Sequence, residues 1–101
     1  MSLGRNVLGT SANIIYTVPA DTYSIVSYTV VNQSETTDAA FTVWIGAQVN
    51  DNLHHYNQQL IKTNSITREN IVLGAGESII AQASTSAVIS ISVDGIETTT
   101  L

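Results

Sequence analysis

The sequence contains no cysteine. A chain without thiols forms no disulfide bond, holds no metal through thiolates and has no cysteine nucleophile. Its fold must therefore be stabilised by packing or by association with other chains.

Charged residues are also scarce, at 11% of the chain, against about a quarter in an average globular domain. The net charge is −5, and the basic residues are Arg5, Lys62 and Arg68 alone. Because so few cations cannot neutralise a phosphate backbone, we do not expect nucleic acid as a partner. Low charge also leaves sheet edges with little protection against association. We therefore expect a subunit that is covered by copies of itself or by a larger assembly.

Long apolar runs are absent as well. Hydrophobic residues make up 44% of the chain, which is too much for a disordered polypeptide. No run approaches the roughly 18 residues that a membrane helix requires, and the first residues lack the apolar stretch of a signal peptide. We expect a folded chain that has no membrane partner and is not marked for secretion. Its 101 residues leave room for one domain.

The sequence does contain short runs of Val, Ile and Thr that alternate with polar residues, a pattern typical of β-strands. Turn signals such as Pro19 and Gly74-Ala75-Gly76 separate these runs. Strands are predicted at 13–18, 22–32, 39–47, 65–73, 78–83 and 87–96, and a short irregular strand or an ordered loop at 53–61. The last two strands, 78–83 and 87–96, are predicted to pair as a hairpin. These strands predict an all-β fold, a single β-sandwich in which jelly-roll-like connections are one arrangement.

The two termini are predicted to lie outside the sandwich, which is assigned to residues 13–97. Residues 1–12 have no stable periodicity and are predicted to form an extended N-terminal arm. Val7 and Leu8 make this arm apolar enough to dock on a neighbouring chain, and a partly frayed terminus is the alternative. Residues 98–101 are predicted to form a C-terminal tail that is held only if it adds to a neighbouring sheet.

Alternation along a strand predicts which side chains face the core. Phe41 and Val43 share one face of the strand at 39–47, which places Trp44 on the other face. An outward Trp is a good interface anchor because its burial removes much apolar area from water. Burial beneath the N-terminal arm is the alternative. Val7, Leu8 and Trp44 are therefore the candidate interface residues.

The same alternation predicts core faces on two further strands. The residues expected in the core are Val26, Tyr28 and Val30 on one strand and Ile89, Ile91 and Val93 on the other. Ile25 departs from this pattern because it is apolar on the polar face. It indicates either a β-bulge or a contact with another molecule.

No motif predicts catalysis, a cofactor or a metal. His54 and His55 are adjacent, so on a strand they face opposite ways and cannot chelate one ion together. Gly74-Ala75-Gly76 is predicted to be a turn and not a phosphate loop, because no Lys-Ser/Thr or helix start follows it. We expect no enzymatic activity, no catalytic residues, no cofactor and no bound metal.

Several motifs resemble small β-sandwich virion structural proteins of tailed bacteriophages, over roughly residues 14–97. The matching segments are the YTVPA opening at 16–20, the Leu-x-Ala-Gly-Glu turn at 73–77, the Ala-Ser-Thr tip at 83–85 and the final Val/Ile strand that ends near Gly95-Ile96-Glu97. These are turn and strand signatures, so they bear on fold more than on a site.

This resemblance implies a non-enzymatic virion component that is assembled in the host cytoplasm. The most specific role it implies is a capsid decoration, or cement, protein that binds as an oligomer, expected to be a homotrimer, over the major capsid protein or another virion protein. A tail, neck or fibre-associated module is one alternative. A carbohydrate-binding β-sandwich is the other, with Trp44, Tyr56 and the Asn50-Asp51-Asn52 turn as its platform.

Overall fold

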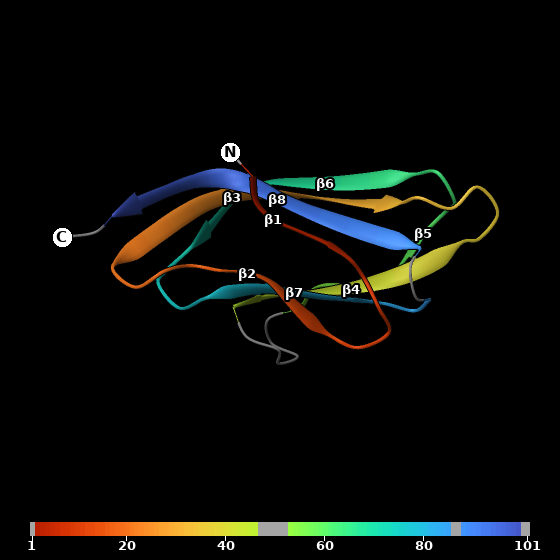
Figure 1. The fold of residues 1–101 in the computed structure, drawn as a ribbon, viewed down its shortest axis with the longest axis horizontal. Helices are drawn as coiled ribbons and strands as arrows, with labels where there is room; N and C mark the ends of the chain where they lie inside the picture. Colours follow the sequence, from red (N-terminus) through yellow and green to blue (C-terminus); the bar gives the residue numbers. More distant parts are fainter. Residues whose placement is uncertain (1, 47–52, 86–87, 100–101) are drawn as a thin grey trace.

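The computed structural model describes residues 2–46, 53–85 and 88–99, and for residue 2 and residues 53–57 it describes the backbone alone. This part of the chain consists of strands joined by turns (Figure 1). The strands are β1 (Ser2–Val7), β2 (Asn13–Thr17), β3 (Thr22–Asn32), β4 (Ala39–Gly46), β5 (Leu53–Leu60), β6 (Ser65–Leu73), β7 (Ser78–Ala83) and β8 (Ile89–Thr99). It contains no helix that could cross a membrane.

The strands form two antiparallel four-stranded sheets that pack face to face (Figure 1). Sheet I has the order β1-β8-β3-β6, and sheet II has the order β2-β7-β4-β5. The first strand thus pairs with the last, the second with the seventh, the third with the sixth and the fourth with the fifth. This nested pairing of eight strands in two sheets is the jelly-roll arrangement. The predicted all-β sandwich with jelly-roll-like connections is confirmed.

The core between the sheets is built from the predicted inward faces. Val26, Tyr28 and Val30 on β3 are at most 1% exposed. The other buried members of this cluster include Phe41 and Val43 on β4, Ile79 and Ala81 on β7, and Ile89, Ile91 and Val93 on β8. Because side chains alternate along a strand, each of these sets leaves every second residue on the outer face of its sheet.

The N-terminal segment is part of the sandwich and not an arm outside it. β1 pairs antiparallel with β8 along its length, from Ser2 opposite Asp94 to Val7 opposite Ser90. Leu8 follows directly, donates its backbone N–H to the carbonyl of Ile89 at 2.7 Å and is fully buried. The segment was predicted to be an extended arm because it lacks periodicity, but the backbone of β1 pairs with the edge of β8, and this pairing does not depend on its side chains.

The predicted hairpin between residues 78–83 and 87–96 is wrong. β7 pairs with β2 and β4 in sheet II, whereas β8 pairs with β1 and β3 in sheet I. Sequence neighbours with a short connection usually pair, but in a sandwich the connection can equally cross from one sheet to the other. The same holds for the turn at Gly74-Ala75-Gly76, which links β6 in sheet I to β7 in sheet II.

Of the predicted C-terminal tail, Thr98 and Thr99 are paired within the chain, and residues 100–101 lie outside the described residues. β8 continues to Thr99, and its last residues pair with the first residues of β3, with Thr99 opposite Thr22. Figure 1 shows this end of β8 and the start of β3 together at one tip of the long axis. The segment 53–61, predicted as an irregular strand or a loop, contains β5 and so is a strand.

Candidate functional site

The described residues contain no group of three or more His, Asp or Glu that could hold a metal ion. Every buried side-chain nitrogen and oxygen in this part of the chain has a hydrogen-bond partner. The side chains of His54, His55 and Tyr56 and the Asn50-Asp51-Asn52 turn lie outside the described residues. The candidate sites of this molecule are therefore surfaces, and they lie on the outer faces of the two sheets.

The three candidate interface residues lie in three different environments. Val7 is 49% exposed and lies at the end of β1. Leu8 is fully buried in the core of its own chain, so its side chain is not on the surface. Trp44 faces away from the core, as predicted from the alternation of β4, yet it is only 8% exposed. Val7 alone among them presents a substantial apolar surface.

Trp44 belongs to a small group of outward-facing side chains on the two central strands of sheet II that are almost fully buried. Its register partner on β7 is Ile80, and Thr42 lies two residues earlier on the same face of β4. These three side chains are 6–8% exposed, although none belongs to the core cluster between the sheets. The N-terminal strand does not account for this, because β1 lies in sheet I on the far side of the core. A Trp so little exposed is not a platform for stacking a sugar.

On the outer face of sheet I, by contrast, the apolar side chains at one end are largely exposed. Ile25 on β3 is directly opposite Ile96 on β8 and Val72 on β6. These three side chains form a row straight across three adjacent strands, and we call them the apolar row. They are 44%, 69% and 67% exposed in that order. Tyr23, two residues before Ile25 and therefore on the same face, is 37% exposed and extends the row.

The sequence pattern indicates one member of the apolar row, Ile25, and gives no signal for the other two. Ile25 was noted because it interrupts an alternating pattern, and a bulge or a contact was expected there. The structure has an irregularity in the pairing of β3 with β6 between Val26 and Tyr28, and it also leaves Ile25 exposed. Ile96 and Val72 gave no such signal, because their alignment with Ile25 depends on the register of three strands that are distant in sequence.

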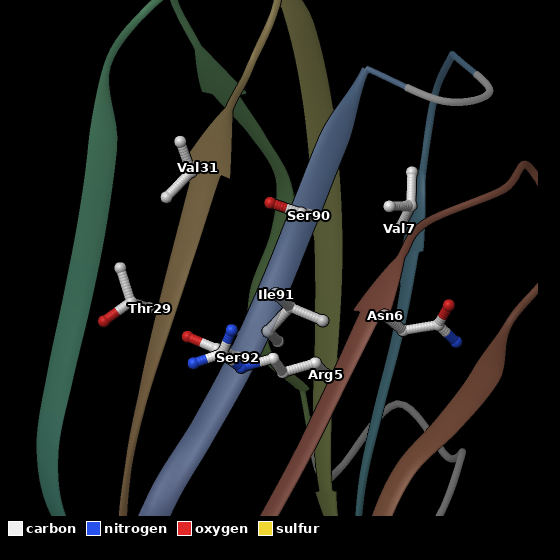
Figure 2. Close-up of a pocket in the computed structure, with 8 residues that line it drawn as sticks. All are labelled: Arg5, Asn6, Val7, Thr29, Val31, Ser90, Ile91 and Ser92. Carbon is white, nitrogen blue, oxygen red and sulfur yellow. The ribbon is translucent and has the colours of Figure 1, made fainter. Parts of the chain in front are cut away.

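The middle of the same face carries a hollow lined by both polar and aliphatic side chains. It has a volume of about 520 Å³ and spans β1, β8 and β3. Its lining includes Arg5, Val7, Thr29, Ser90 and Ser92. Figure 2 shows the Arg5 side chain reaching from β1 across β8, with its guanidinium beside Ser92. We refer to this feature as the hollow.

Two hydrogen-bond clusters tie the sheets together at the edges of the core. In the first, the Tyr16 hydroxyl donates to Glu97 Oε2 at 2.6 Å and lies 2.6 Å from Ser24 Oγ. Because the phenol has one proton, it accepts from Ser24 when it donates to Glu97. Tyr16 belongs to β2 in sheet II, and its two partners belong to sheet I. Burial, with the bond to Glu97, raises the pKa of Tyr16 above its usual value.

The second cluster surrounds Asn32, the last residue of β3, which is fully buried. Its Nδ2 donates to the carbonyls of Thr37 and Leu60 at 2.9 and 3.0 Å, and its Oδ1 accepts from the backbone N–H of Ser34 at 2.9 Å. Leu60 ends β5, so this side chain also connects sheet I to sheet II. Asn32-Gln33-Ser34 also matches the Asn-X-Ser pattern of N-glycosylation sites. In this fold, however, the Asn32 amide is buried and is not accessible at the surface.

No family model, curated protein or solved structure matches this chain.

Proposed function

We propose that this chain is a non-enzymatic structural subunit of a tailed-bacteriophage virion, and that it decorates the capsid as an oligomer, a trimer, over the major capsid protein. The observation that carries this proposal is the apolar row on the outer face of sheet I. The motif resemblance over residues 14–97 and the low content of charged residues, 11%, support it independently.

The apolar row has the properties of a contact surface. Ile25, Val72 and Ile96 come from three adjacent strands and present a continuous aliphatic surface. Fully burying an aliphatic side chain is worth roughly 1.5–3 kcal/mol, so covering these partly exposed ones contributes about 1 kcal/mol each. Contiguous exposed apolar surface of this kind commonly marks a contact with another protein.

The fold is compatible with such a subunit. Jelly rolls of eight strands occur in viral capsid proteins and in lectins, so the architecture by itself does not select between them. A small rigid unit that is present in many copies stabilises a shell through many weak and simultaneous contacts. About 3 kcal/mol from one apolar row is therefore sufficient when many copies bind together.

The experiment is a measurement of native mass by light scattering over a range of concentrations, on the wild-type chain and on two matched double variants. Val72→Thr with Ile96→Thr removes two members of the apolar row. Ile14→Thr with Ile61→Thr removes two aliphatic side chains of similar exposure, 64% and 53%, elsewhere on the surface. Threonine keeps the preference for strand conformation. We expect a trimer for the wild type and the control, and a shift toward monomer for the row variant.

Locating the labelled chain on phage particles by electron microscopy tests the capsid assignment. Density over the capsid surface is expected. A label confined to the tail, neck or fibres would replace decoration by the alternative structural role. A wild-type chain that stays monomeric at all concentrations and binds no particle would contradict the proposal as a whole.

A further inference from the structure

The hollow on the outer face of sheet I brings together chemistry that the decoration role does not use. The Arg5 side chain reaches from β1 across β8 to Ser92, and Thr29 of β3 also lines the hollow (Figure 2). These residues are distant in sequence, and the register aligns them, with Arg5 opposite Ser92 and Ser92 opposite Thr29. The three strands thus place the Arg5 guanidinium and the hydroxyl groups of Thr29, Ser90 and Ser92 in one hollow.

Arg5 has no carboxylate to pair with among the described residues. The nearest acidic residue along β8 is Asp94, two residues beyond Ser92, and it does not line the hollow. A guanidinium presents a planar set of N–H donors whose geometry matches a carboxylate, and the pair forms two parallel hydrogen bonds. In a chain of net charge −5, a cation on an otherwise uncharged patch favours an acidic ligand.

The other side chains that line the hollow indicate which class of acidic ligand it would bind. Ser90 and Ser92 from β8 and Thr29 from β3 offer hydroxyls, each of which both donates and accepts a hydrogen bond. Val7 and Val31 flank them with aliphatic surface. Hydroxyl groups that donate and accept, next to aliphatic side chains, complement a saccharide, whose own hydroxyls do the same and whose ring carbons are apolar.

The volume of the hollow, about 520 Å³, falls within the roughly 300–1,000 Å³ of small-ligand sites. It accommodates one or two sugar residues. No aromatic side chain lines it, so neutral sugars lack the stacking contact that commonly holds them. The carboxylate is then the group that anchors the ligand.

We infer that the hollow is a binding site for an acidic saccharide, with Arg5 holding the carboxylate of a uronic or other sugar acid, and with Thr29, Ser90 and Ser92 binding its hydroxyls. This site does not depend on the proposed decoration role, because it uses a different part of the face from the apolar row. A virion subunit and a free-standing binding module would carry it equally.

The test is calorimetric titration of the purified chain with digalacturonate, a glucuronate disaccharide and sialyllactose, each against its neutral counterpart. Arg5→Gln removes the cation and keeps an amide of similar length, and Lys62→Gln is the matched control because it removes one charge from an exposed turn. We expect saturable binding of at least one acidic saccharide, weakened roughly tenfold or more by Arg5→Gln and within about twofold by Lys62→Gln. Backbone amide shifts should map the contact to residues 90–92.

Thermal unfolding of Arg5→Gln, followed by circular dichroism, verifies that the variant stays folded. Ser92→Val is a second variant, which removes the Ser92 hydroxyl from the same hollow. The inference is overturned if none of the three acidic saccharides binds at millimolar concentration, if the neutral counterparts bind as well as the acidic ones, or if Arg5→Gln binds as tightly as wild type. Equal or tighter binding of a tetraglutamate peptide would also overturn it, since the site would then recognise an acidic protein segment.

Discussion

The outer faces of the two sheets differ in what they expose. On sheet I, Ile25, Val72 and Ile96 are 44–69% exposed although all three are aliphatic. On the two central strands of sheet II, β7 and β4, Ile80 and Trp44 are less than 9% exposed although they too face away from the core. Both faces carry apolar residues in register across neighbouring strands. The difference teaches that strand alternation reports the direction of a side chain and not its exposure.

The strongest test of this difference is Trp44→Ala. We expect it to lower the free energy of unfolding by about 3–5 kcal/mol, because a nearly buried aromatic side chain leaves a cavity when it is truncated. Chemical denaturation measures this value. Ile14→Ala is the control, since Ile14 lies in register with Ile80 on the same outer face but is 64% exposed, and it should cost less than about 1 kcal/mol. Similar small effects of both variants would mean that the outer face of sheet II is as exposed as that of sheet I.

A second prediction concerns the side chain that joins the ends of both sheets. Asn32→Ala should destabilise the fold by about 2–3 kcal/mol, because it removes three hydrogen bonds and leaves the Leu60 carbonyl without its amide donor. Urea unfolding at neutral pH measures the effect. Asn64→Ala, the same change at an exposed turn residue, should stay within about 0.5 kcal/mol. An equal loss of stability at both positions would contradict the claim that the buried hydrogen bonds of Asn32 stabilise the fold more than an exposed amide does.

A third prediction follows from the tyrosines between the sheets. Burial raises the pKa of both Tyr16 and Tyr28 above 10.0. Since the unfolded chain releases these protons first as the pH rises, stability is complete below pH 10 and falls above it. Free energies of unfolding between pH 8 and 11.5 should show this loss in the wild type. Tyr16→Phe with Tyr28→Phe should flatten the profile.

The smallest expected effect concerns the apolar row itself. Val72→Thr and Ile96→Thr should each change the stability of the isolated chain by less than about 0.5 kcal/mol, because more than three fifths of each side chain is already exposed. Thermal unfolding of dilute protein measures this. A cost above about 2 kcal/mol would show that the row is covered within the chain and would end its role as a contact surface.

The sequence predicted the fold class and most of the strands. The predicted bounds of 22–32, 65–73 and 78–83 match β3, β6 and β7. Regular alternation with a turn signal at each end is local information, and it is sufficient to define such strands. β1 was missed because its residues have no alternation, and it is a strand only because β8 offers an unpaired edge.

The candidate sites were less predictable than the fold. Arg5 lay in a segment expected to be an arm, so no sequence pattern gave a reason to place it opposite Ser92. Ile96 ended a predicted strand, and the sequence did not indicate which face of the sheet its side chain is on. Both positions result from the pairing of β8 with β1 on one side and β3 on the other. That pairing joins residues between 57 positions apart, for Asn32 and Ile89, and 92 positions apart, for Ser2 and Asp94, beyond the reach of any local pattern.

The sequence by itself determined the local conformation of the chain: which segments are extended, where they turn and which side of each strand is apolar. The physical reason is that backbone sterics and the two-residue period of a strand depend on adjacent residues alone. The tertiary structure decided the strand order, the burial of Leu8 and Trp44 and the alignment of the apolar row and the hollow. These depend on which distant strands share hydrogen bonds, and that choice minimises the free energy of the whole chain and not of any one segment.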